Sequence, residues 1–129
     1  MSMQMTGLQA CHDKATAMRL ADLAGELREL LGARLVAYIG SVGETRAVRE
    51  WSEGRRAPGS RQVQLKLRLA YEIAACIADV DGRETAQAWF QGLNPLLDDV
   101  SPARLLREGD YEEVGPRILA AARHFLAQG

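Results

Sequence analysis

The sequence predicts an all-α fold with a helical N-terminal module, a long central helix and a small helical C-terminal module. In the long segments, apolar residues recur three or four positions apart, the spacing of one face of an α-helix. No segment alternates between apolar and polar residues over the length of a strand. Apolar residues make up 47% of the chain but aromatic residues only 5%, so we expect an aliphatic, helix-packed interior.

The length of 129 residues suits one domain, or two small modules that share a core. Residues 1–15 lack helical periodicity, and we expect a disordered leader there. The first module then covers residues 16–80, including the central helix, and the second module covers residues 81–129. Within the first module, leucines repeat at helical spacing over residues 16–31 until Gly32, which suits a helix end.

Residues 35–58 predict a helix-turn-helix. A short apolar helical pattern is interrupted at residues 40–43, Gly-Ser-Val-Gly, where the two glycines are able to adopt positive φ. A second helix follows over residues 44–52 and places Trp51 on its apolar side, as an anchor in the core. In such a motif, the second helix is offered to the major groove of DNA.

The central helix is predicted to begin after Ser60, which can cap it, and to run to residue 79 or 80. It carries two apolar stripes, where a surface helix needs only one. A helix with two stripes is buried between layers, so we expect it to join the two modules. The stripes are Val63, Leu67, Ala70, Ala74 and Ile77, and Leu65, Leu69, Ile73, Cys76 and Val80.

Three shorter helices are predicted in the C-terminal module. The first covers residues 83–90 and ends at the turn-forming stretch 91–95. The second starts near Pro102, with Ser101 as its cap, and ends before Gly109. The last spans residues 110–127, but Pro116 lacks a backbone donor and is expected to kink this helix or delay its start.

Several classes of protein are excluded by what the sequence lacks. Glycine fingerprints for phosphates, a nucleophile elbow and clustered metal ligands are missing, so we expect no enzyme, no cofactor and no metal site. Cys11 and Cys76 are far apart and are expected to be free thiols. Without an apolar run of roughly 20 residues or a signal pattern, the chain is expected to be cytoplasmic.

Charge is unevenly distributed, although the net charge is only −1. Residues 44–68 carry a net charge of +4 and residues 79–129 a net charge of −4, which suggests two surfaces with different partners; random scatter is the alternative. Thr45, Arg46 and Arg49 are candidates for contacts with DNA bases, and Arg55, Arg56 and Arg61 for contacts with phosphates. A solvated helix face remains the other interpretation, because Glu44 and Glu50 repel phosphate.

The C-terminal module has more apolar residues than one small helix and its loop require. Core packing is the first interpretation, and an oligomer or partner interface is the second. This surplus of apolar residues predicts a homodimer, since helix-turn-helix proteins commonly bind two DNA half-sites as dimers. The residues concerned are Trp89, Phe90, Leu93, Leu96 and Leu97.

The chain resembles a known family at two places. Residues 35–58 resemble the helix-turn-helix of Xre-type regulators, with Trp51 and the glycine three residues later. The C-terminal order of residues is more specific and is similar to the toxin-binding domain of Xre/MbcA/ParS-type antitoxins. It consists of Trp89, Asn94-Pro95-x-Leu97, Pro102-x-x-Leu105-Leu106-x-x-Gly109 and a terminal amphipathic helix.

This resemblance implies an antitoxin that pairs with a toxin carrying an RES domain, which degrades NAD. It also implies a homodimer within a larger complex, a C-terminal part that covers the entrance to the toxin's active site, and binding to the operator. The end of the chain, residues 123–129, combines an apolar anchor with polar groups and a carboxylate, and so suits a dinucleotide cleft. Removal of these residues is expected to leave folding intact. Candidate toxin-binding residues are therefore Trp89, Asn94, Leu97, Arg123, His124, Phe125, Leu126, Gln128 and Gly129.

The sequence is thus interpreted as a cytoplasmic antitoxin that inhibits an RES-domain toxin and represses its own operon. The alternative is a stand-alone Xre-type transcriptional regulator whose C-terminal module only dimerises. A third interpretation is an interaction adaptor with a degenerate helix-turn-helix, given the acids at Glu44 and Glu50.

Overall fold

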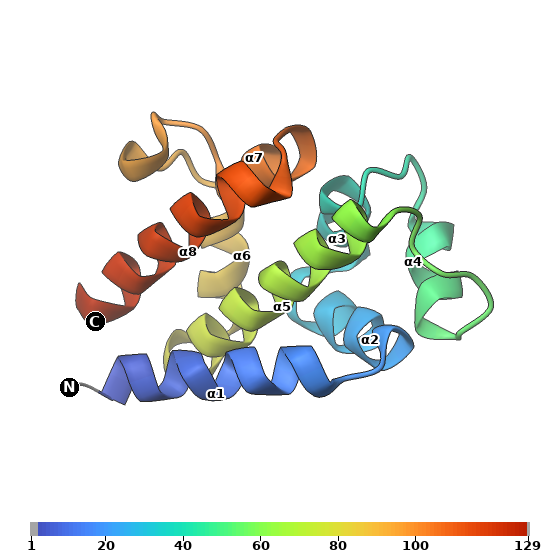
Figure 1. Ribbon diagram of the computed structural model, residues 1–129, viewed down its shortest axis with the longest axis horizontal. Helices are drawn as coiled ribbons and strands as arrows, with labels where there is room; N and C mark the ends of the chain where they lie inside the picture. The colour runs from blue at the N-terminus through green and yellow to red at the C-terminus, as the bar shows by residue number, and fades with distance from the viewer. Residues whose placement is uncertain (1–2, 129) are drawn as a thin grey trace.

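The computed structural model describes the backbone of residues 3–128 and the side chains of residues 7–128. Within that range the chain forms eight α-helices and one short 3-10 helix, and it contains no strand, which confirms the all-α prediction (Figure 1). The helices are α1 (Met3–Ala17), α2 (Leu20–Leu31), α3 (Ala33–Ile39), α4 (Thr45–Ser52), α5 (Arg61–Asp81), α6 (Arg83–Gln91), η1 (Pro95–Leu97), α7 (Pro102–Glu108) and α8 (Tyr111–Gln128).

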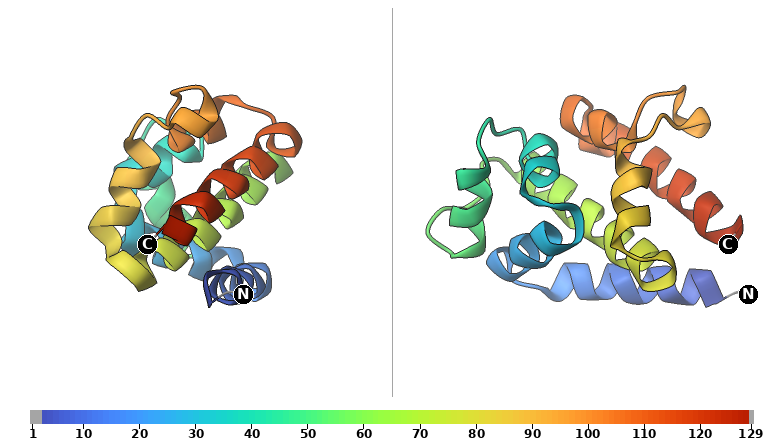
Figure 2. Two further views of the ribbon diagram at one scale, coloured as in Figure 1. Left: turned by 90° about the vertical axis from the view of Figure 1, so that its left-hand side faces the viewer. Right: turned by 180° about the vertical axis from the view of Figure 1, so that it is seen from behind.

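Helix α5 is the centre of the molecule, as its two apolar stripes predict. It packs against α1, α2, α3, α6 and α8, and the views in Figure 2 show it running through the middle of the fold. The Ser60 hydroxyl accepts a hydrogen bond from the Val63 amide at 3.3 Å and caps the helix, as expected. At the other end, Gly82 has φ of +90°, a conformation that glycine adopts without the strain of a Cβ. Only Val80 of the predicted stripes is exposed.

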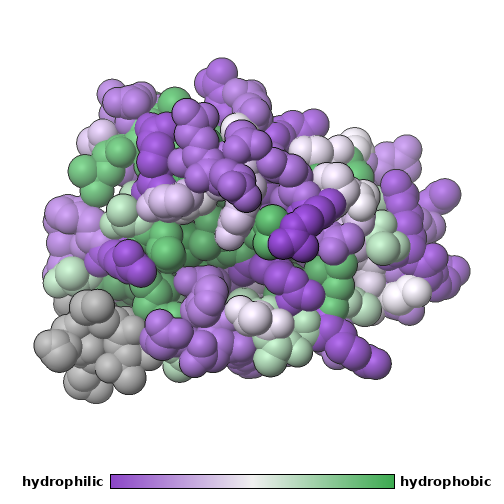
Figure 3. Space-filling view, viewed as in Figure 1, coloured by the Kyte–Doolittle hydropathy of each residue, from purple (hydrophilic) through white to green (hydrophobic). Residues whose placement is uncertain are grey.

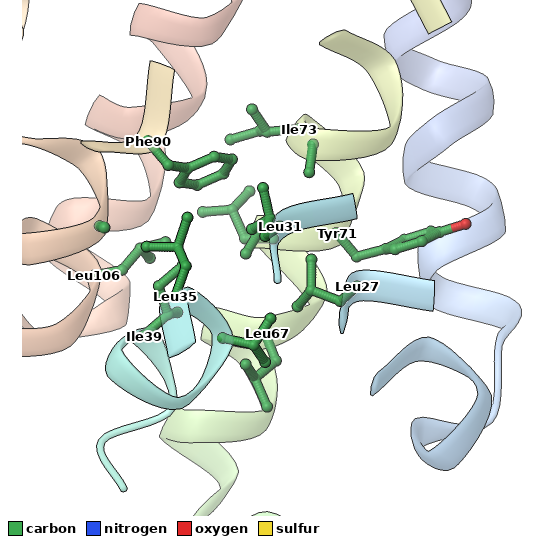
Figure 4. Packing of buried hydrophobic residues seen from close by; sticks show 14 of the residues in the cluster. Leu27, Leu31, Leu35, Ile39, Leu67, Tyr71, Ile73, Phe90 and Leu106 are labelled. Atoms are coloured by element: carbon green, nitrogen blue, oxygen red, sulfur yellow. The ribbon is translucent and has the colours of Figure 1, made fainter. Parts of the chain in front are cut away.

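A single cluster of buried side chains runs through the fold (Figure 4). Leu35 from the first part of the chain lies near Phe90 and Leu106 from the second part, and Leu27 and Leu67 belong to the same cluster. The proposed boundary between modules at residue 80 therefore lies beside a continuous core. The division into two modules stays a prediction.

The expected disordered leader is wrong for the residues that the structure describes, because residues 3–17 form helix α1. This helix packs against α5 and α8, and buries Leu8 and Ala15. Arg68 of α5 donates from Nη1 to the Ala15 carbonyl at 2.6 Å and to the Met18 carbonyl at 2.9 Å, which holds the end of α1. The sequence hides this helix because much of its contact with α5 is made by small side chains. Residues 1 and 2 lie outside the described range.

The first predicted helix, residues 16–31, is also corrected at its start. Arg19 has φ of −66° and ψ of 147°, an extended conformation that separates α1 from α2. Leu23, Leu27 and Leu31 are buried, as their helical spacing predicts. The error at this boundary comes from residues 16–18, which continue the pattern of α2 in sequence, although residues 16 and 17 end α1 and residue 18 lies in the bend between the two helices.

The C-terminal helices agree closely with prediction. Ser101 accepts a hydrogen bond from the Arg104 amide at 3.1 Å and caps α7, with Pro102 at its first position. The last helix, α8, begins at Tyr111 and continues past Pro116 to Gln128, so Pro116 does not delay its start. Both Pro116 and Glu112, whose carbonyl loses its helical donor, lie on the exposed side of α8, where water can replace the missing bond.

Candidate functional site

Helix α4 presents a polar surface at one end of the molecule. All six candidate DNA-binding residues are exposed: Thr45, Arg46, Arg49, Arg55, Arg56 and Arg61. Figure 3 shows a mostly hydrophilic surface at this end, on the side where Figure 1 places α4. Ala47, Val48 and Trp51 lie on the opposite, buried side of the helix, so the core fixes which residues α4 offers to solvent.

Acidic residues moderate the charge of this surface. Glu50 lies 3.4 Å from Arg46 and 3.5 Å from Arg56, and Glu53 lies 2.9 Å from Arg55. Exposed ion pairs of this kind stabilise little, so a phosphate or a base can replace the carboxylate as partner of an arginine. Within the described chain, Arg49 and Arg61 have no carboxylate within 4.0 Å. Arg49 is the unpaired cation on the exposed face of α4.

A second basic feature lies beside the start of α4, where α7 packs against α3. A hollow of about 360 Å³ is lined by Arg34, Tyr38, Thr45 and Arg107, among others. Arg107 donates from Nη1 to the Tyr38 carbonyl at 2.7 Å, and its guanidinium carbon lies 4.8 Å from the centre of the Tyr38 ring. Sequence reasoning missed Arg34 and Arg107, because only the packing of α7 on α3 places them next to Thr45.

At the other side of the fold, α6, η1 and α8 form a groove of about 380 Å³, which we call the α6–α8 groove. Its floor holds Trp89 and Phe125, whose ring centres are 6.4 Å apart. His124 and Gln128 line it from α8 with their side-chain nitrogens 2.9 Å apart, and Asn94 lines it from the loop. The groove thus combines an aromatic floor with a polar margin.

Two leucines extend the groove onto the surface. Leu93 and Leu96 line it and are 75% and 54% exposed, and Figure 3 shows hydrophobic side chains over this loop. Hydrogen bonds to Asn94 hold this loop together. The Asn94 side-chain oxygen accepts from the Leu96 amide at 2.9 Å, and the Asn94 carbonyl accepts from the amides of Leu97 and Asp99. The exposed leucines are therefore held in place by a compact, hydrogen-bonded turn.

Comparison with known proteins now identifies the family. The chain is 36% identical over 77 residues to the mycobacterial cidal antitoxin MbcA of Mycobacterium tuberculosis H37Rv, which covers 60% of this chain and 67% of that protein. The same figures hold for MbcA of Mycobacterium tuberculosis CDC 1551 and of Mycobacterium bovis. The chain belongs to the Xre/MbcA/ParS-type antitoxins. No family model matches it, and no solved structure matches it significantly.

This antitoxin is not an enzyme, since it is homologous to the non-enzymatic MbcA. Among residues 7–128, no three His, Cys, Asp or Glu side chains are grouped to hold a metal ion. None of the helices in the described chain has the length and apolar character needed to cross a bilayer. Burial lowers the pKa of Lys66 and raises the pKa of Cys11, but both groups lie away from the two surfaces described above.

The structure brings together five of the predicted toxin-binding residues: Trp89, Asn94, His124, Phe125 and Gln128 all line the α6–α8 groove. It separates Arg123, which lines a different hollow with Tyr111 and Pro116 on another face of α8. The candidates are thus divided between two faces of one helix, which their position in the sequence does not reveal. Gly129 lies outside the described residues.

Two predicted contact residues need correction. Leu97 and Leu126 are only 1% and 3% exposed, so they belong to the core and offer no surface to a partner in this fold. Phe90 is likewise buried, in agreement with core packing as its first interpretation. The C-terminal segment is not a loose tail, because it is helical to Gln128 and contributes Leu126 to the core. Removing residues 123–129 is therefore expected to disturb folding, contrary to the expectation from sequence.

Proposed function

We propose that this antitoxin neutralises its toxin by docking the α6–α8 groove, together with Leu93 and Leu96, onto the toxin. We propose further that the toxin is an RES-domain enzyme that degrades NAD, and that docking covers the entrance to its active site. The observation that carries this proposal is the gathering of Trp89, His124, Phe125 and Gln128 in one groove beside two exposed leucines.

The composition of the groove supports a protein partner. Protein interfaces concentrate aromatic anchors in a central pocket and surround them with polar groups that make hydrogen bonds. Trp89 and Phe125 have the place of such anchors, while His124, Gln128 and Asn94 have the place of the polar rim. Large, exposed apolar side chains such as Leu93 are costly to leave in water unless a partner covers them.

The proposal includes regulation of the antitoxin's own operon in the cytoplasm. Thr45, Arg46 and Arg49 would enter the major groove, while Arg55, Arg56 and Arg61 would contact backbone phosphates. A homodimer would present two copies of α4 to two half-sites. The exposure of all six side chains at the end of the molecule where α4 lies supports this role.

Substitution of the exposed leucines tests toxin binding. We expect Leu93→Lys and Leu96→Lys to abolish neutralisation, because each places a charge where an apolar contact is needed and leaves the core intact. Val80→Lys is the matched control, since Val80 is 58% exposed but lies at the end of α5, outside the groove. The readouts are growth and cellular NAD during co-expression with the neighbouring toxin gene, and recovery of the complex by affinity purification.

The outcomes separate the parts of the proposal. Full protection by both leucine variants would exclude the α6–α8 groove as the toxin-binding surface. Growth arrest by the free toxin without a fall in NAD would exclude an NAD-degrading partner. If no toxin is neutralised while DNA binding persists, the stand-alone regulator is the correct interpretation.

The oligomeric state is tested separately by sedimentation at micromolar concentration, alone and with the toxin. A homodimer is expected for the antitoxin alone, and a homodimer within a larger hetero-oligomer when the toxin is present. A monomer in both would contradict the dimer and the pairing of half-sites.

A further inference from the structure

We propose that the hollow between α3, α4 and α7 binds a phosphate of the DNA backbone through Arg34 and Arg107. This inference rests on the proposed DNA binding by α4 and extends it to α7, in the part of the chain predicted to bind toxin. It assigns a role to two arginines that the helix-turn-helix pattern does not include.

The side chain of Arg107 is held in a fixed position by contacts with Tyr38. One of its N–H groups donates to the Tyr38 carbonyl at 2.7 Å, and its guanidinium stacks on the Tyr38 ring. These contacts hold the side chain in one position while Nε and Nη2 remain free to donate. A guanidinium held in this way loses little conformational freedom on binding, which favours recognition of a phosphate.

Among the described residues, no carboxylate competes for the arginines of the hollow. Its lining contains Arg34 and Arg107 but no Asp or Glu. Within the described chain, neither arginine has a carboxylate within 4.0 Å, whereas Arg46, Arg55 and Arg56 each have one. Two unpaired cations around a hollow of about 360 Å³ attract an anion without first having to give up an ion pair.

The hollow lies beside the first turn of α4. Thr45, the first residue of α4, lines the same hollow. The first turn of a recognition helix meets base edges, so the sugar-phosphate backbone must pass close to that turn. On the other side of the turn that contains Val42 and Gly43, a second hollow is lined by Arg46 and Arg56, and also by Glu44. A DNA strand crossing this turn would therefore meet cations on both sides.

The DNA backbone is favoured over an acidic patch of the toxin as the occupant. The hollow adjoins α4, while the α6–α8 groove shares none of its lining residues. A toxin seated on the α6–α8 groove would leave the hollow open to DNA.

Arg107 also has a structural role, because it donates to the Tyr38 carbonyl near the end of α3, which accepts from the Ser41 amide as well, and so links α7 to α3. Arg34→Gln is therefore the main variant, as Arg34 is exposed and no hydrogen bond depends on it in the described chain. Arg107→Gln is the second variant. Arg83→Gln is the control: this exposed arginine begins α6, beyond the far end of α5, a helix of 21 residues that spans about 30 Å.

The experiment measures the affinity of the full-length protein for DNA from upstream of its own gene and for an unrelated duplex, over a range of salt. Each lost phosphate contact reduces the slope of log affinity against log salt concentration by about one, because one fewer counterion is released on binding. The ratio of the DNA affinity of wild type to that of Arg34→Gln should thus fall about threefold when the salt concentration rises about fourfold. The same change is expected on both duplexes, and Arg83→Gln should behave as wild type.

Each other result overturns the inference. If Arg34→Gln and Arg107→Gln keep the salt dependence of wild type while Arg55, Arg56 and Arg61 substitutions reduce it, the hollow is not a phosphate site, although α4 binds DNA. If Arg34→Gln impairs toxin neutralisation but not DNA binding, the occupant is the toxin. If wild type shows no salt-sensitive binding to either duplex, the proposed DNA binding fails as well.

Discussion

Gly40 shows how one residue determines the packing of the helix-turn-helix. A Cβ at this position would lie 2.7 Å from the Trp51 ring and 3.2 Å from the Val36 carbonyl. Trp51 is 1% exposed and is enclosed by the core, so its ring cannot move away from an added methyl group without disturbing its neighbours. The glycine is thus needed for close approach and not for an unusual backbone conformation, because its φ is −81°. The positive φ in this turn belongs to Ser41, at 61°, and not to the two glycines that the sequence suggests.

Substitution at Gly40 tests this explanation. We expect Gly40→Ala to lower the free energy of unfolding by about 1–3 kcal/mol, because the methyl group overpacks the site of Trp51. Gly43→Ala is the matched control in the same turn, since a Cβ there has no heavy atom within 4 Å. Its effect should stay within about 0.5 kcal/mol. Urea denaturation followed by tryptophan fluorescence measures both, and equal effects would contradict the packing argument.

At the scale of elements, α1 is the main addition that the structure makes to the sequence. It lies along α5 with small residues at the contact: a Cβ on Gly7 would be 3.9 Å from the Cys76 sulfur. Cys11 lies one turn further along α1 and interacts with Cys76 as well. Burial, together with Cys76, raises the pKa of the Cys11 thiol to about 12. A thiol in a disordered leader would not experience this environment.

The reactivity of Cys11 therefore reports whether α1 is docked. At pH 8 almost no thiolate is present at a pKa of about 12, so alkylation should be much slower in the native protein than in urea. Mass spectrometry of peptides distinguishes Cys11 from Cys76 in the same sample. Equal rates at Cys11 with and without urea would show that the leader is disordered after all.

The same shift predicts how stability depends on pH. Because the pKa of Cys11 is higher in the folded state than its ordinary value of 9.0, its contribution to stability is complete below pH 9 and is lost as pH rises toward 12. Cys11→Ala should flatten this part of the curve of unfolding free energy against pH. The comparison with wild type separates the contacting thiols Cys11 and Cys76 from Tyr71 and Tyr111, whose pKa values burial also raises. Identical curves for the two proteins would contradict the assignment.

At the scale of the whole molecule, the continuous core predicts that the entire chain unfolds together. Helix α5 belongs to the helix-turn-helix side through α2 and to the C-terminal side through α6 and α8. If α5 unfolds, the helices before it and the helices after it both lose part of their buried core. The surface of α4 and the α6–α8 groove are therefore supported by one continuous core, although they lie on different helices.

The two tryptophans allow a direct test of this cooperativity. Trp51 reports on α4 and Trp89 on α6, so Trp89→Phe and Trp51→Phe each leave one reporter. In each variant, we expect the fluorescence transition to coincide with the loss of helical circular dichroism during thermal unfolding. Independent modules at residues 16–80 and 81–129 would instead give two separated transitions.

For the functional surfaces, the sequence was sufficient where a residue's role follows from its place on one helix. The exposed side of α4 is predictable, because Trp51 and its apolar neighbours must face the core and thereby turn Thr45, Arg46 and Arg49 outward. Leu97 and Leu126 could not be placed in this way. Whether an apolar side chain is buried or exposed depends on which other helix covers it.

What the sequence alone determined is local: most of the helices, the capping serines at positions 60 and 101, and the central position of α5. Periodicity, caps and turn residues act within a few positions, so they can be read without knowing the neighbours. Only the tertiary structure decided that α1 is folded and that Arg34 and Arg107 line one hollow beside Thr45. It also decided that His124 and Arg123 line different hollows. These features arise from contacts between helices far apart in the chain, and such contacts leave no periodic signal in either partner.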